Sequence, residues 1–399
     1  YRIFSQVRRE SGFEAFDGAL EAAGIHDEAA LAAYHRQVRN QGELTLDAER
    51  VEHIAVLPRV TVGAEIAIGS ALVRRLLLAF PEARISYLGA RKLGPLFEGE
   101  PRLRVVPFAF PRRGGLRARL EAWVELRVAL DSLKVDLVVG PDSRGDQVGI
   151  LPVVEDPGRY LYWENTMVEG GAPKPMAGLL DAHLTRLGLG GEGSARPTLW
   201  PRSEVVAFAR GVWSRLALEG ARGISIKYDV GGLLAKSLGP AFEEAHFMGV
   251  LASGDYDVVA FDRGFGDEEL ARSGALLAKA EAAGYSVVSV TDLGRDGVGF
   301  RPSALPDPTH SPRARILAFH GTIGGWGALS LMTQSAFSYD SVHQHLAAAD
   351  RILTPGAEPL PGSNTVVAFA GYPTPWFPQL WAPVGRGRIE VIRGEGVPW

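Results

Sequence analysis

The sequence predicts an α/β protein made of two parallel-sheet domains. Short apolar segments rich in β-branched residues alternate with segments of helical periodicity. The alternation stops in a glycine- and proline-rich stretch at 190–204 and then starts again. The length of 399 residues suits two domains of about 100 to 200 residues each. We therefore expect two Rossmann-like halves that face each other across a cleft, with ligands at the carboxyl ends of the strands.

The first half is expected to follow a helical extension over residues 1–50, where apolar residues recur at three- and four-residue spacing. The first domain then covers 51–200. Its strands are predicted at 53–60, 84–90, 103–108, 135–143 and 159–163, with helices at 71–83, 116–134 and 176–189.

The second domain is predicted over 201–399, with the possibility that its C-terminal segment packs back on the first domain. Its strands are expected at 223–230, 256–264, 285–292, 315–321, 335–341 and 365–371. Helices are expected at 241–252, at 267–284, between 321 and 335, and from Val342 onward.

Composition excludes several classes of site. The chain has no cysteine, which rules out a disulfide scaffold, a thiolate zinc site and a cysteine nucleophile. A net charge of −4 does not indicate nucleic acid as a partner, so an anionic ligand must be held by local charge. No apolar run approaches the roughly 18 residues of a membrane span, and the first residues are polar; we expect a cytoplasmic protein without a membrane span.

The segment around Asp340 and Ser341 is a candidate anion site. Either residue can cap the helix that follows the strand, and the free N–H groups of its first turn then suit a phosphate. His343 and His345 can add donors. An ordinary capped helix with surface histidines explains the pattern equally well. Two histidines at i and i+2 do not share a helix face, so no metal site is expected.

Other candidates lie at the carboxyl ends of predicted strands. Lys236 precedes a helix that starts at Pro240 and can reach a diphosphate, although most lysines are solvated surface charges. Glu65, after Gly63, can serve as a general base or simply favour the helix dipole. A further group after the fourth strand suits ligand contact: Asp142, Ser143, Arg144 and Asp146.

Glycine patterns do not indicate a dinucleotide cofactor. The run GTIGGWG at 321–327 is not at the first strand–helix turn of a domain, where such a fingerprint belongs. A phosphate-binding loop of the GxxxxGK[ST] type, HExxH and GxSxG are all missing from the sequence.

Four blocks, in order, resemble the heptosyltransferase-type glycosyltransferases, family 9 of the GT-B fold. The resemblance spans about residues 51–385. The blocks are HIAVLPRVTVGAEIAIGSALVRRLLLAFPEARISYL, AKSLGPAFEE, YDSVHQHLAAA and VVAFAGYPTPWFPQLWAP, which are similar to the family's opening strand and LGD turn, KRWPxxxFxxL, DSGPMHLAAA and LFGPTxPxxWxP blocks.

The resemblance implies an inverting, metal-independent transfer from a nucleotide-diphosphate sugar, commonly ADP-heptose, with no cofactor. The second domain would bind the nucleotide. Its diphosphate would be held by Lys236 and by the segment Asp340, Ser341, Val342, His343, Gln344 and His345. Acceptor-side residues would be Gly63, Ser143, Arg144 and Asp146.

One departure concerns the base. The family's aspartate position holds Ala64 here, so Glu65, or Asp142 or Asp146 after the neighbouring strand, would have to replace it. A small-molecule, natural-product acceptor is the leading expectation. The alternatives are a lipopolysaccharide-core heptosyltransferase, a nucleotide-sugar epimerase of the same fold, and a non-catalytic sugar-nucleotide-binding subunit.

Overall fold

The computed structural model describes residues 14–39, 48–59, 61–111, 115–140, 151–163, 174–189, 196–217, 219–230, 236–293, 300, 305, 307, 313–371 and 376–394. The chain divides into two compact units. The first comprises Tyr1–Arg91, Arg102–Ala172 and Gly178–Ala195, and the second comprises Lys92–Pro101, Pro173–Ala177 and Arg196–Trp399. Three short segments of the expected first domain therefore belong to the second unit: Lys92–Pro101, Pro173–Ala177 and 196–200.

The first unit contains a five-stranded parallel sheet in the order β3-β2-β1-β4-β5. All five predicted strands of this half are confirmed. They are β1 (His53–Val56), β2 (Arg84–Gly89), β3 (Leu103–Pro107), β4 (Leu137–Gly140) and β5 (Tyr160–Tyr162). Every residue of β1 is buried, as expected for a central strand covered on both faces. The strand order reverses between β1 and β4, the place where open parallel sheets commonly bind ligands.

The predicted N-terminal extension is helical and packs into the core of the first unit. It forms α2 (Glu14–Ala22) and α3 (Glu28–Arg39) in the described part. The Phe16 ring lies edge-on to Trp123 of α7 (Gly115–Leu133), with centroids 5.5 Å apart. The Tyr34 hydroxyl donates to the Val154 carbonyl at 2.7 Å. The extension therefore contributes to the same apolar core as the sheet.

A π-helical turn interrupts the helix that follows β1. The segment comprises α4 (Val62–Ala64), the π-helical turn η2 (Glu65–Gly69) and α5 (Ser70–Ala79). The Ser70 N–H donates to the Glu65 carbonyl, five residues back. Turns of this kind often occur at functional sites. The last helix of this unit is α8 (Met176–Arg186), whose Asp181 accepts from the fully buried Arg75 at 2.8 Å.

The second unit contains a seven-stranded parallel sheet in the order β14-β13-β11-β7-β8-β10-β9. Its strands are β7 (Gly223–Lys227), β8 (Val258–Asp262), β9 (Ser286–Thr291), β10 (Arg315–His320), β11 (Ser335–Tyr339), β13 (Asn364–Phe369) and β14 (Ile389–Arg393). Six of them are predicted strands; β14, a half-exposed edge strand, was not expected. A separate pair joins β6 (Thr198–Leu199) to β12 (Asp350–Arg351).

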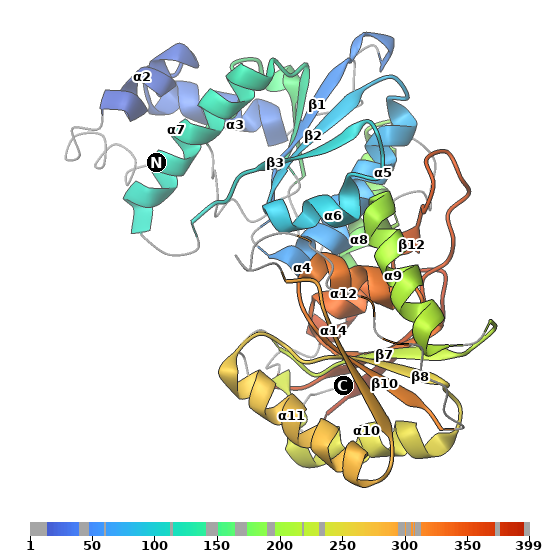
Figure 1. The fold of residues 1–399 in the computed structure, drawn as a ribbon. Helices are drawn as coiled ribbons and strands as arrows, with labels where there is room; N and C mark the ends of the chain where they lie inside the picture. The colour runs from blue at the N-terminus through green and yellow to red at the C-terminus, as the bar shows by residue number, and fades with distance from the viewer. Residues whose placement is uncertain are drawn as a thin grey trace. The chain divides into compact units, whose positions relative to one another are not determined.

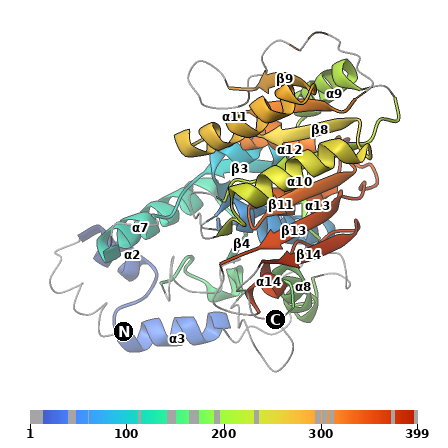
Figure 2. The same ribbon diagram turned by 90° about the horizontal axis from the view of Figure 1, so that it is seen from below.

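Helices cover both faces of this sheet. One face carries α10 (Pro240–Ser253) and α11 (Asp267–Ala282), which lie in front of the strands in Figure 2. The other carries α12 (Ile323–Ser330), which contacts β7, β8 and the unpredicted helix α9 (Ser203–Leu216), as Figure 1 shows. The remaining short helices are η1 (Ala48–Arg50), η3 (Arg91–Leu93), α6 (Gly94–Phe97), η4 (Pro157–Arg159), α13 (Val342–Ala348) and α14 (Phe377–Trp381). None of the helices in the described ranges is long and apolar enough to cross a membrane.

Candidate functional site

Lys236 and Asp340 meet at the carboxyl edge of the seven-stranded sheet. Lys236 follows β7, and Asp340 comes directly after the neighbouring strand β11. The Lys236 Nζ lies 2.7 Å from Asp340 Oδ2, and the Gln344 side-chain amide donates to Asp340 Oδ1 at 2.7 Å. Both carboxylate oxygens are therefore occupied, which fixes the direction of the lysine. The fold thus brings together three residues that the sequence singled out as a diphosphate site.

Ser341 caps the helix that follows. Its hydroxyl accepts from the His343 N–H at 3.3 Å and lies 3.0 Å from the Ser338 hydroxyl. Extended backbone at Ser341, with φ of −144°, lets α13 begin at Val342. The predicted cap is therefore present at the predicted residue.

The two histidines of α13 are not the exposed donors that the sequence suggested. His343 is fully buried and His345 is 4% exposed. The Trp326 indole N–H donates to His343 Nδ1 at 3.1 Å, which assigns the proton of the neutral ring to Nε2. Burial lowers the pKa of His343 and of His345 to about 3, so both rings are neutral at physiological pH. The two rings therefore add no positive charge to this segment.

The sequence did not predict a buried cation that lies near the same edge of the sheet. Lys227, the last residue of β7, is paired with Asp262 and lies 3.3 Å from Asp229. The two carboxylates outweigh burial and raise the pKa of this lysine, which keeps it charged. Its only signal in the sequence is a lysine that ends the apolar strand GISIK and precedes Asp229 by two residues.

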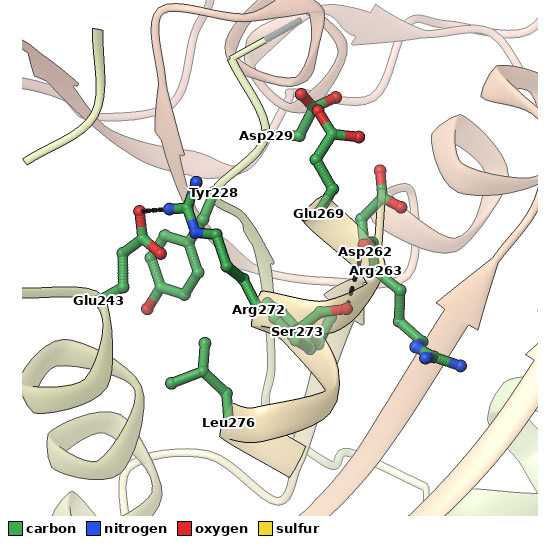
Figure 3. A pocket seen from close by; sticks show the side chains of 10 residues that line it. Tyr228, Asp229, Glu243, Asp262, Arg263, Glu269, Arg272, Ser273 and Leu276 are labelled. Carbon is green, nitrogen blue, oxygen red and sulfur yellow. Dashed lines mark hydrogen bonds and ion pairs between the residues drawn. The ribbon is translucent and has the colours of Figure 1, made fainter. Parts of the chain in front are cut away.

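A small pocket that opens to solvent lies between the ends of β7 and β8 and the helices α10 and α11 (Figure 3). The Asp229 and Glu269 carboxyl groups lie side by side at its upper rim in that view. Burial and the hydrogen bond with Asp229 raise the pKa of Glu269. Arg272 extends along the wall and pairs with Glu243. None of these lining residues was predicted as part of a site.

Glu65, the candidate base, lies in the first unit at the π-helical turn. Thr61 caps the preceding helix by accepting from the Ala64 N–H at 3.3 Å. Glu65 is 3% exposed and Tyr87 is fully buried. Burial and the adjacent Glu65 carboxylate raise the pKa of Tyr87 well above its ordinary value. Gly89 allows this close packing, because a Cβ there would lie 2.9 Å from Glu65 Oε2.

The remaining predicted acceptor-side residues divide into two groups. Gly63 is a half-buried residue of α4, two positions before Glu65. Asp142, Ser143, Arg144 and Asp146 lie outside the described residues. In the described ranges, no group of three or more histidine, aspartate or glutamate side chains could hold a metal ion.

Solved structures of low sequence identity resemble this chain over most of its length. The glycosyl transferase family 9 protein from Veillonella parvula superposes with a TM-score of 0.58 at 13% identity, over 87% of each chain. E. coli heptosyltransferase WaaC, solved with ADP, gives 0.52 at 14% identity, over 86% of this chain and 94% of that one. E. coli ADP-heptose lps heptosyltransferase II gives 0.52 at 12% identity, over 85% and 90%.

No protein-family model matches the sequence, and no curated protein matches it. The structural likenesses establish the fold: the chain has the two-domain α/β architecture of the GT-B glycosyltransferases. They also confirm the resemblance to heptosyltransferase-type enzymes that the four sequence blocks predicted.

Proposed function

We propose that the chain is an inverting glycosyltransferase. It moves a heptose or related sugar from a nucleotide-diphosphate donor, ADP-linked, to a hydroxyl or amine of a small-molecule acceptor. The observation that carries this proposal is the Lys236–Asp340 ion pair at the capped start of α13. It places a cation beside the start of a helix, and the similar WaaC protein was solved with ADP.

These groups act on the leaving group. As the sugar–phosphate bond breaks, the nucleoside diphosphate gains negative charge, and donors that already point toward it stabilise the transition state. Lys236 is held by Asp340 before the donor arrives, and Gln344 keeps the carboxylate in place while the ammonium turns toward phosphate oxygens. In this proposal the protein supplies the positive charge itself, without a metal ion.

The base that deprotonates the acceptor is the less constrained part of the proposal. Glu65 lies at the start of the π-helical turn that follows β1, and Asp142 follows β4 in the sequence. Glu65→Gln and Asp142→Asn should be compared under identical conditions. The variant that lowers kcat without changing donor KM identifies the base. If both keep the wild-type kcat, neither carboxylate is the base.

A second candidate function is binding of a sugar nucleotide without transfer. It is favoured by Ala64 at the position of the family's aspartate and by the burial of Glu65 against Tyr87.

One experiment separates the two functions. Wild-type protein is incubated with ADP-heptose, with and without a panel of small hydroxyl and amine acceptors and a lipopolysaccharide-core acceptor, and the products are identified by mass. A glycosylated acceptor supports transfer, and the acceptor that is used distinguishes a small-molecule enzyme from a lipopolysaccharide-core heptosyltransferase. Free epimerised sugar nucleotide supports the epimerase. ADP-heptose binding without any product supports the binding subunit, and no binding overturns the whole proposal.

A further inference from the structure

Glu243, on the first turn of α10, is a buried carboxylate with three different hydrogen-bond donors. It is 2% exposed. The Ser237 hydroxyl donates to Glu243 Oε1 at 2.8 Å, and the Tyr339 hydroxyl donates to the same oxygen at 3.2 Å. The Arg272 guanidinium, on α11, donates to it as well. One oxygen therefore connects a loop, a strand end and a second helix.

Two of these donors are the sequence neighbours of the ion pair in the candidate site. Ser237 follows Lys236, and Tyr339 precedes Asp340. Glu243 therefore binds both chain segments whose side chains meet in the Lys236–Asp340 contact.

The loop between Lys236 and α10 is held tightly around this contact. The Gly239 N–H donates to the Ser237 hydroxyl at 2.9 Å, so Ser237 bridges the loop backbone and Glu243. Gly239 has a φ of +92°, which a residue with a Cβ rarely adopts. A loop with this geometry and a buried anchor has few ways to place Lys236.

The chemistry of the contact makes the anchor strong. A hydrogen bond to an ionised group is roughly twice as strong as one between neutral groups. A buried carboxylate is costly without such partners, so the folded state favours the arrangement in which all three donors are engaged. The third donor, Arg272, also lines the neighbouring pocket (Figure 3).

We propose that Glu243 is a positioning residue, which sets the direction of Lys236 and Asp340 through Ser237 and Tyr339. It is not itself expected to touch the donor. The inference rests on the proposed function only in taking Lys236 as a diphosphate ligand.

The test compares Glu243→Gln with Glu244→Gln. Glu244 is the adjacent residue but is half-exposed, and its partner is Lys279. ADP affinity is measured by calorimetry, and amide hydrogen exchange is followed in peptides covering 236–243 and 336–345. We expect Glu243→Gln to weaken ADP binding by about fivefold, equivalent to one lost hydrogen bond, and to speed exchange in both peptides. Glu244→Gln should change neither.

The remaining outcomes also decide the proposal. Unchanged ADP affinity in folded Glu243→Gln overturns it, with or without faster exchange, because Glu243 would then only stabilise packing. If wild-type protein does not bind ADP, the proposed function fails, and exchange in the two peptides alone decides whether Glu243 orders them. If Glu243→Gln does not fold, Ser237→Ala and Tyr339→Phe each remove one donor. Each should then speed exchange in its own peptide, and no change in either overturns the proposal.

Discussion

Two successive helices, α12 after β10 and α13 after β11, use their first turns differently. At α12 the Asp292 carboxylate accepts from the Thr322 N–H at 2.6 Å and from the Thr322 hydroxyl. At α13 the adjacent Asp340 turns away to Lys236 and Gln344. The start of α12 therefore binds a carboxylate of the chain itself, whereas the start of α13 lies beside the Lys236 ammonium.

The glycines of the GTIGGWG run explain how Asp292 fits. A Cβ on Gly321 or Gly325 would overlap the Asp292 carboxylate. Two glycines of this run therefore make room for an internal carboxylate. At α12 a carboxylate of the chain binds the helix start, whereas at α13 the carboxylate beside the helix start pairs with a lysine and the cap is the Ser341 hydroxyl.

Removing Asp292 should have the largest effect, and on stability. In Asp292→Ala the half-buried Thr322 donors lose the buried carboxylate that accepts from them, and the free energy of unfolding should fall by about 3 kcal/mol. ADP affinity of the folded protein should stay within about twofold, since the α12 start is structural. Denaturant unfolding and calorimetry measure the two quantities, with the exposed Asp255→Ala as control. A loss of ADP binding would contradict the prediction that the start of α12 has only a structural role.

Acid should destabilise the α13 side next. The pKa of His343 falls from 6.5 in an unfolded chain to about 3 in the folded one. The unfolded state therefore binds the proton first, and stability is lost as pH falls below 6.5. Between pH 7 and pH 5 this histidine should cost about 2 kcal/mol. His343→Gln should remove that part of the pH dependence, measured by unfolding at both pH values; an unchanged slope would contradict the buried neutral ring.

Lys236→Ala tests the cation at the α13 start. ADP affinity and donor turnover should each fall at least about tenfold, because an ammonium–phosphate contact is lost. Calorimetry and product formation measure them. Lys279→Ala removes an exposed lysine that is also paired with a carboxylate, that of Glu244. It should leave both ADP affinity and donor turnover unchanged. Wild-type kinetics in Lys236→Ala would remove this residue from the site.

The smallest effect is expected from the residue that holds Asp340. Gln344→Met keeps the side-chain volume but releases Asp340 Oδ1. Lys236 is then positioned by a freer carboxylate, and ADP affinity should fall by about threefold. A gain in affinity would instead indicate that Asp340 competes with the donor for the lysine.

Much of the fold could be predicted because buried parallel strands are continuous apolar runs. β1, β8 and β10 are of this kind, whereas β14 carries Glu390 and Arg393 and was missed. The helix α9 was missed because it follows directly on the glycine- and proline-rich stretch.

The candidate site could be predicted only in part. Lys236 and Asp340 were found from the spacing of the blocks, but Glu243, Lys227 and Asp292 were not. A buried charge looks in sequence like any surface charge, and its partner is remote: Glu243 and Tyr339 are 96 positions apart. The prediction that the α13 histidines are donors to a ligand was wrong, because the spacing of polar residues does not reveal that this seven-residue helix is buried from His343 onward.

The π-helical turn η2 gives the chain one residue more than a regular helix needs between Glu65 and α5. Deleting a single residue from 66–68 would let i→i+4 bonds replace the i→i+5 bond and leave an unbroken helix. The deletion would also rotate Glu65 by about 100° relative to α5. Length variation at this one place can therefore redirect a carboxylate without a change of residue type, which makes η2 a point where insertion and deletion can alter chemistry while the sheet stays as it is.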